Sequence, residues 1–293
     1  AEYAPTIMGY NSASNENNYL RSRVRSFLNR PTASLTQWNN ELYDYGIVSV
    51  FGHYLVDHYG VEILTESLKN SNKVGIESIE EILKKKGIND TFEDIFTNWT
   101  IASYVNDCSL GDKYCYKNDN LKTLQVIPFS NFVPFSGEST LVIGQTLSNW
   151  SSHWQRFSGA NKDLKLVFDG RNQEEIKAYY ITRYYTGKQE IKEIVLGTNQ
   201  TKEIIFPKMG VDIASLVLVV SAQDKTIPFN QQSNYYYSIS VSTVNPVVEE
   251  PQEQAIELPF EVDKPLNQMN KEELLMVIIR LIIHLLMQGK LVI

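Results

Sequence analysis

Residues 42–60 read LYDYGIVSVFGHYLVDHYG, and this stretch decides how the first half of the chain folds. Its apolar residues recur at steps of three and four, which places them on one broad face of a helix. The residues of this face are Ile47, Val50, Phe51, Tyr54, Leu55 and Tyr59. Gly46 and Gly60 bracket the helix, as an expected entry turn and C-cap. The apolar face predicts a buried helix around which other helices pack.

The composition sets the class of protein. A chain of 293 residues is longer than one core usually fills, so we expect two domains and a tail. Hydrophobic content of 43% with 21% charged residues is ordinary for a globular chain and speaks against disorder or a multi-span membrane protein. The net charge is −7, and the dense basic run at 84–86 falls at the end of a predicted helix. We therefore expect no nucleic-acid partner.

Residues 1–121 are predicted to be all-helical. Apolar residues at helical spacing mark further helices over 15–28, 61–68, 76–86 and 91–105. The four residues that begin at Ser34 form a capping box, which predicts another helix with Leu35, Trp38 and Leu42 facing inward.

Beyond residue 124 the hydrophobic period changes to two and the segments shorten to strand length. The expected strands are 140–143, 150–157, 164–168, 176–185, 190–196, 201–206, 214–222 and 235–243. About eight strands separated by turn residues predict an antiparallel β-sandwich, jelly-roll or immunoglobulin-like.

The predicted fold class is multidomain α + β. Its segments are an all-helical subdomain (1–121), a β-sandwich (122–245), an acidic, proline-rich linker (246–268) and a C-terminal helix (269–293). The composition of the linker is that of a stiff, extended chain.

The C-terminal helix is expected to begin after Asn270, a good N-cap residue. Its apolar run is short for a membrane span, which needs about 20 residues, and Arg280 and His284 interrupt it. We expect residues 270–293 to self-associate or to lie on a surface, with a marginal membrane anchor as the alternative.

The chain contains two cysteines, Cys108 and Cys115, which flank a loop that carries Gly111. A small disulfide-closed loop is the prediction and suits an exported protein, whereas two free thiols are the alternative. A metal site would need more ligands than this pair supplies.

Ser49, His53 and Asp57 lie along one stripe of the helix over 42–60 and invite comparison with a catalytic triad. A serine nucleophile needs a cleft with an oxyanion site, usually at a strained turn. We therefore interpret the three as solvated or interhelix hydrogen-bonding residues. No H-E-x-x-H occurs, and His53 and His58 are five apart, off the spacing of a helical zinc site. The arginines Arg21, Arg23 and Arg25 are interpreted as a solvated helix surface.

Several short motifs follow one another in the first 121 residues. They are Ala1-Glu2-Tyr3-Ala4, Tyr45-Gly46, Phe51, Tyr54-Leu55, Tyr59-Gly60, and Trp99 with Ala102. In this order the chain resembles the downstream part of gluzincin-type zinc metallopeptidases of the hyicolysin-like and immune-inhibitor-A-like kind. In that family an H-E-x-x-H helix precedes a helix with a glutamate ligand, and helices with a Y-G…F…Y-L…Y-G pattern follow.

The resemblance implies that the chain is the C-terminal portion of a secreted or surface-attached zinc metallopeptidase, which hydrolyses peptides or proteins by zinc-activated water. The zinc ligands and the general base would lie before Ala1, so zinc is implied in the intact protein, and this chain is expected to bind none and to be inactive. Glu2 is a zinc ligand only if the register is shifted. Tyr43 or Tyr45 is a candidate to stabilise the oxyanion, unless both pack in the core.

The alternative is a non-enzymatic extracellular surface or binding protein, in which the helices are a scaffold. Its ligand face would be the tyrosines of one predicted strand, Tyr179, Tyr180, Tyr184 and Tyr185. Strand alternation also allows about half of them to point into the sandwich. Both functions predict an extracellular or cell-surface location.

Overall fold

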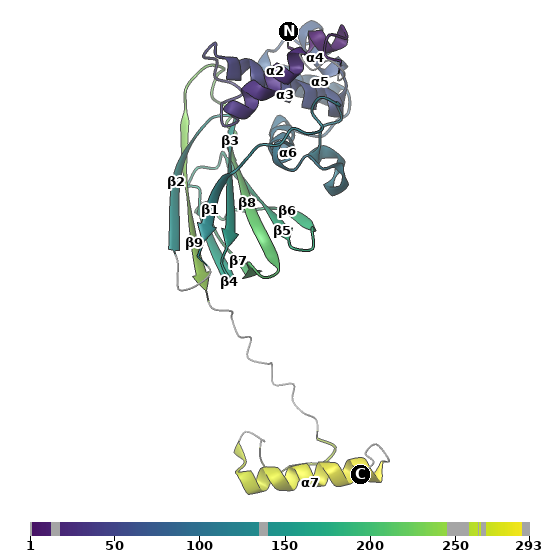
Figure 1. Cartoon of the computed structure of the whole chain (residues 1–293), viewed down its shortest axis with the longest axis vertical. Coiled ribbons are helices and arrows are strands. Elements are labelled where there is room, and N and C mark those ends of the chain that lie inside the picture. Colours follow the sequence, from purple (N-terminus) through teal and green to yellow (C-terminus); the bar gives the residue numbers. More distant parts are fainter. Residues whose placement is uncertain are drawn as a thin grey trace. The chain divides into compact units, whose positions relative to one another are not determined.

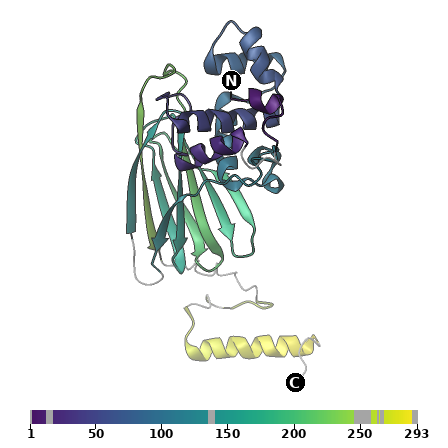
Figure 2. The ribbon, with the colours of Figure 1, turned by 45° about the horizontal axis from the view of Figure 1, so that its top comes forward.

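The computed structural model describes residues 2–12, 18–134, 140–244, 258–262, 264 and 268–288. The chain divides into two compact units, Ala1–Pro246 and Val247–Ile293. Figure 1 shows the helices of the first unit gathered at one end of its strands, and Figure 2 shows these strands side by side.

The helical part of the first unit is built around α3, which spans Leu42–Tyr59. The other elements are α1 (Ala4–Ile7), α2 (Tyr19–Asn29), α4 (Glu62–Lys69), α5 (Gly75–Lys85), α6 (Phe92–Val105) and the 3-10 turns η1 (Cys108–Leu110) and η2 (Asp112–Tyr114). Helices α2, α4 and α6 contact α3, and α3 has buried residues on both its apolar and its polar stripe. The prediction of a central buried helix is confirmed.

Gly46 lies inside α3 and not at its entry, so the expected entry turn is wrong. A Cβ built on Gly46 would lie 2.5 Å from the backbone nitrogen of Phe27 in α2. Only glycine allows the two backbones to come this close. The helix instead begins after Glu41, whose N–H donates to the Asp44 carboxylate at 2.9 Å. Gly60 is the C-cap with φ of 81°, as expected.

The helix predicted to begin at Ser34 is wrong, because the chain from Ser34 to α3 is irregular. Its backbone binds to the β-rich part and not to itself. The N–H of Leu35 donates to the carbonyl of Trp150 at 2.8 Å, and that of Trp38 donates to the Asn230 side chain at 2.9 Å. These bonds take the place of the backbone hydrogen bonds that a helix would form within itself.

The β-rich part forms one nine-stranded mixed sheet in the order β1-β3-β8-β7-β4-β9-β2, with β5 paired to β8 and β6 paired to β5. The strands are β1 (Phe129–Val133), β2 (Thr140–Ser148), β3 (Ser151–Gly159), β4 (Lys162–Asp169), β5 (Ile176–Tyr184), β6 (Gln189–Glu193), β7 (Thr201–Met209), β8 (Ile213–Ala222) and β9 (Asn234–Val244). The prediction of a β-rich domain is confirmed.

The antiparallel arrangement that we predicted holds for most strand pairs but not for all of them. Strand β1, which the sequence pattern did not predict, runs parallel to β3, and β7 meets β8 in parallel at one residue pair. The other strand pairs are antiparallel. A jelly-roll or immunoglobulin-like sandwich stays a prediction.

Strand β8 belongs to two hydrophobic cores. Val217 and Val219 pack with Trp154 into the core of the helices, whereas Leu216 and Leu218 face the core of the strands. A strand that is covered on both faces reads as a continuous apolar run, which explains the sequence LVLVV. Helices and sheet thus pack as one compact unit, and the predicted boundary between two domains stays a prediction.

The second unit contains α7, which spans Lys271–Met287. Its N-cap is Asn270, whose side chain accepts from the N–H groups of Glu272 and Glu273 at 3.0 Å each. Most of the predicted linker lies outside the described residues, but Lys264 pairs with Glu273 at 2.6 Å. None of the helices in the described part is long and apolar enough to cross a membrane.

Candidate functional site

The candidate site forms where α2 crosses α3 at Gly46. The crossing brings the guanidinium of Arg23 to 4.7 Å from the ring centroid of Tyr45. Tyr19, one turn earlier on α2, holds its ring centroid 4.4 Å from the same guanidinium. Glu2, just before α1, accepts from Arg23 Nε at 2.9 Å. We call Glu2, Tyr19, Arg23 and Tyr45 the Glu2–Arg23 cluster.

The charges of this cluster are balanced and largely shielded from water. The side chains of Arg23 and Glu2 are 13% and 19% exposed. The Tyr19 hydroxyl accepts from Arg23 and donates to Glu2 Oε2 at 3.0 Å. Burial raises the pKa of Tyr19 further above neutral pH, and its phenol is the proton donor to Glu2. Both the carboxylate and the guanidinium of the cluster therefore already have partners of opposite charge.

The two tyrosines proposed as oxyanion donors lie in different surroundings. Tyr45 belongs to the cluster, and its hydroxyl donates to Asn40 Oδ1 at 3.0 Å near the surface. Tyr43 packs against the helical core, with the guanidinium of Arg30 4.4 Å from its ring centroid. The structure thus brings Glu2 and Tyr45 to the same arginine and leaves Tyr43 elsewhere.

Arg23 is a residue that sequence reasoning missed. It was interpreted as part of a solvated surface, yet its side chain lies between two tyrosine rings and the Glu2 carboxylate. The available signal was the four-residue step from Tyr19 to Arg23, which puts an aromatic ring and a cation on one side of α2.

His53 is fully buried and joins α1 to α3 by hydrogen bonds. Its Nδ1–H donates to the carbonyl of Ser49 at 2.7 Å, because a carbonyl is only an acceptor. Its Nε2 then accepts from the hydroxyl of Thr6 at 2.7 Å, and Thr6 accepts from Asn11 at 2.8 Å. Burial lowers the pKa of His53, which keeps the imidazole neutral.

The stripe of Ser49, His53 and Asp57 does not form a triad. The carbonyl of Ser49 binds His53, and the hydroxyl of Ser49 is buried without a hydrogen-bond partner among the described residues. Asp57 accepts from the backbone N–H groups of Lys117 and Asn118 at 2.8 and 3.0 Å. Of the three side chains, only His53 bonds to another helix in the described part of the chain, and Asp57 binds a loop.

The described residues do not fit a zinc site. They contain no group of three or more His, Cys, Asp or Glu side chains placed to hold a metal. Glu2 is paired with Arg23, which competes with a cation for the carboxylate. His58 donates to the carbonyl of Cys115 at 3.0 Å, and His153 is bonded to the Tyr237 hydroxyl at 3.1 Å. Ala1, the first residue of the Ala1-Glu2-Tyr3-Ala4 motif, lies outside the described residues.

The cysteine loop packs on α3. Cys108 and Cys115 form a disulfide, with 5.0 Å between their Cα atoms. The hydroxyl of Tyr54 on α3 donates to the carbonyl of Lys113 inside the loop at 2.7 Å. The disulfide thus closes a loop that covers one side of the central helix.

The tyrosines of β5 do not gather into one ligand face. Tyr179 packs against the helical core, and burial raises its pKa to about 12. Tyr180 and Tyr184 pack against the core of the strands. Tyr185 is exposed. Strand alternation therefore splits the set between two cores and the solvent.

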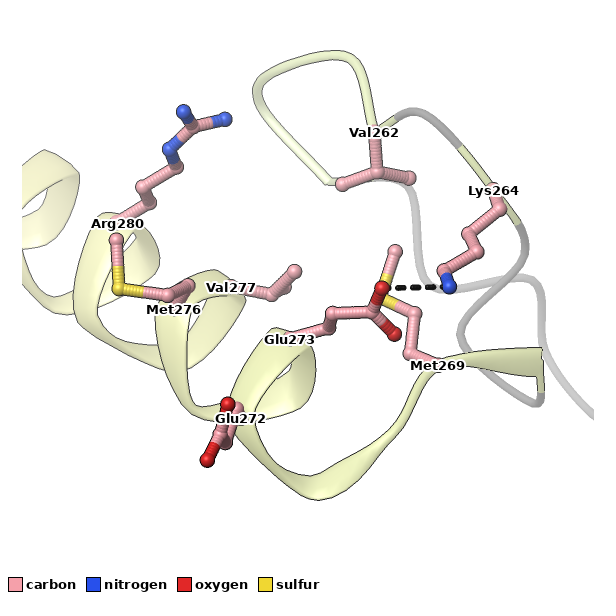
Figure 3. A pocket seen from close by; sticks show the side chains of 8 residues that line it. All are labelled: Val262, Lys264, Met269, Glu272, Glu273, Met276, Val277 and Arg280. Carbon is pink, nitrogen blue, oxygen red and sulfur yellow. Dashed lines mark ion pairs between the residues drawn. The ribbon is translucent and has the colours of Figure 1, made fainter.

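Hollows between described residues also lie outside the helical part. One of about 710 Å³ is lined by Gly144, Gln145, Thr146, Arg171, Tyr236 and Tyr237. Another, of about 360 Å³, belongs to the second unit, and Figure 3 shows Val262, Lys264 and Met269 on one side of it and side chains of α7 on the other.

No protein-family model and no curated protein matches the chain. Among solved structures, it is similar to the pre-peptidase C-terminal domain of a collagenase from Bacillus anthracis, at 15% identity over 39% of this chain and 96% of that domain, with a TM-score of 0.27. It is also similar to PliG from Aeromonas hydrophila, a periplasmic inhibitor of g-type lysozyme, at 12% identity over 40% of this chain and 100% of that one, with a TM-score of 0.26. These likenesses are too slight to assign a function.

Proposed function

We propose that this chain is the C-terminal part of an exported zinc metallopeptidase that acts on peptides or proteins. In this proposal the helices complete the peptidase domain, and the β-rich part is an accessory β-sandwich. The observation that supports it is the Glu2–Arg23 cluster. It joins Glu2, from the motif that resembles the ligand region of the family, to Tyr45, a candidate oxyanion donor, at the surface of the helices.

The other motif residues of the resemblance have structural roles. Gly46 permits the crossing of α2 over α3, and Gly60 ends α3. Phe51, Tyr54 and Trp99 are buried in the helical core. We expect a family with this arrangement of helices to share residues at such positions. The Cys108–Cys115 disulfide suits an oxidising, extracellular location.

Zinc has no place among the described residues, so the proposal assigns the zinc ligands to sequence outside this chain. In this proposal Glu2 forms an ion pair with Arg23 and does not bind the metal. A Glu2→Gln exchange in a longer, zinc-binding form should leave the zinc content unchanged, whereas a zinc ligand would lose most of the metal.

The test compares this chain with a form extended through the sequence encoded upstream. We expect the extended form to bind one zinc ion for each chain and to cleave casein, and this chain to do neither. Metal analysis and casein cleavage measure both properties. An extended form that contains H-E-x-x-H and is inactive would contradict the peptidase assignment, and zinc with activity in this chain would contradict the placement of the ligands.

The same extended form tests Tyr45. If its phenol donates to the oxyanion, Tyr45→Phe should lower kcat by about 10²- to 10³-fold with little change in KM. Tyr43→Phe is the matched control, because this tyrosine packs against the core. Equal and small effects of the two exchanges would assign Tyr45 to packing.

A second candidate function is a non-enzymatic extracellular binding protein, and the hollow beside Arg171 and Tyr236 favours it. Tyr236 is 52% exposed, so its ring is available for contact with a ligand. Retention on immobilised casein without cleavage, lost on Tyr236→Ala and kept on Tyr185→Ala, would support this function. Cleavage by the extended form would favour the peptidase.

A further inference from the structure

The second unit presents an apolar helix surface that the other described residues of this unit leave uncovered. No residue of α7 is buried. Leu275, Ile278, Ile282 and Ile283 are 56%, 52%, 40% and 50% exposed. A helix that is apolar around most of its circumference is normally buried.

The spacing of the apolar residues defines a seam along α7. Leu275, Ile278, Ile282 and Leu285 stand at the a and d positions of two successive heptads. The charged Glu273 and Arg280 both fall at the f position, opposite this seam. The seam is therefore the wholly apolar side of the helix, and the charged residues at f lie opposite it.

The segment before α7 lies away from the seam. The hollow of about 360 Å³ is lined on the helix by Glu272, Glu273, Met276, Val277 and Arg280, at positions b, c, e and f. Lys264 pairs with Glu273 there at 2.6 Å, and Figure 3 shows this pair beside Val262 and Met269. These described residues thus lie on the outward side and leave Leu275, Ile278 and Ile282 of the seam exposed, with Leu285 half-buried.

We propose that the seam of α7 packs against the same helix of other copies of this chain, in a bundle of more than two helices. The width of the apolar surface argues for more than two. The e and g positions carry Leu274, Ile279, Leu281 and Leu286, where two-stranded coiled coils usually carry charges. A single neighbouring helix would leave most of these side chains in water.

The charge of α7 favours helices over lipid as the partner. Helices that lie on anionic membranes are rich in Lys and Arg on their polar face. Here Lys271 and Arg280 are matched by Glu272 and Glu273, so there is no excess of positive charge. A bundle would also hold several copies of the first unit together, which raises their avidity for a multivalent substrate or surface. This inference does not depend on the peptidase assignment.

The test exchanges two adjacent isoleucines in the full chain and measures mass by sedimentation equilibrium. Ile282→Glu places a carboxylate in the seam and should weaken association by about 100-fold or more. Ile283→Glu adds the same charge at the b position and should leave association nearly unchanged. The wild-type chain should sediment as three or more copies.

Several results would overturn the proposal. These are a monomeric wild-type chain, a dimer, or equal effects of the two exchanges. A monomer that sediments with vesicles of phosphatidylcholine and phosphatidylglycerol would identify lipid as the partner. Thermal melts of the first unit provide the folding control, because both exchanges lie in the second unit and the melting temperature of the first should stay the same.

Discussion

Helices α3 and α7 are nearly equal in length, with 18 and 17 residues, and both are largely apolar. Yet α3 is covered along most of its length, whereas α7 has no buried residue. The cover of α3 comes from α2, α4, α6 and the disulfide loop, all on the same chain. The comparison shows that an apolar pattern predicts that a helix is covered but does not identify what covers it.

The largest expected loss of stability comes from disrupting the packing of α2 on α3. Gly46→Ala places a Cβ 2.5 Å from the backbone nitrogen of Phe27, so α2 must move away. We expect a loss of about 3 kcal/mol in the free energy of unfolding. Gly52→Ala is the matched control in the same helix, because a Cβ there meets nothing within 4 Å, and it should gain about 0.5–1 kcal/mol. Urea unfolding followed by circular dichroism measures both, and similar values would contradict the close crossing.

The next effect tests the loop that covers α3. Replacing both Cys108 and Cys115 by serine removes the disulfide, and the chain-entropy estimate for so short a loop is a loss of about 2–3 kcal/mol. Urea unfolding of the wild type with reductant should show the same loss, and the double variant should not respond to reductant. If reductant did not change the unfolding of the wild type, the two thiols would be free, which would contradict the disulfide.

Low pH should also lower the free energy of unfolding of the first unit. Burial lowers the pKa of His53 and His58 and lowers that of His153 to about 4. The unfolded chain, with histidine pKa values near 6.5, takes up protons first, so this stability is complete above about pH 6.5 and falls as the pH drops toward 4. For His153 we expect a loss of about 2–3 kcal/mol between pH 7 and pH 4. Urea unfolding of His153→Gln should show a smaller difference between these pH values, and an unchanged difference would contradict the assignment.

The smallest effect concerns the Glu2–Arg23 cluster. Glu2→Gln removes the charge from a largely shielded ion pair and should cost about 1 kcal/mol. Asp119→Asn does the same in the exposed pair with Lys122 and should cost less than about 0.5 kcal/mol. Thermal melts rank the two variants. A larger loss for Asp119→Asn would mean that the cluster does not hold the chain before α1 in place.

Much of the fold follows from local patterns. The period of 42–60 predicted α3, and alternation predicted most strands, because side-chain burial imposes these periods directly. The helix expected at Ser34 failed because Leu35 and Trp38 bind the β-rich part, far away in sequence. Strand β1 was missed because its Phe129 and Phe132 are exposed, so no alternation marks it.

The candidate site was predicted only in part. Glu2 and Tyr45 were named separately, but Arg23, which holds both, was assigned to the solvent. The link depends on the helix crossing at Gly46, and one sequence does not tell a glycine that permits a crossing from one that makes a turn. The sequence pattern predicted the individual segments, but it did not predict the contacts between them.

Hydrogen exchange at several protein concentrations tests the central comparison most directly. The amides of α3 should be protected equally at every concentration, because segments of the same chain cover this helix. The amides of α7 should gain protection as the concentration rises, because other copies cover it. Protection of α7 that does not change with concentration, or exchange in α7 that stays fast at every concentration, would contradict the account.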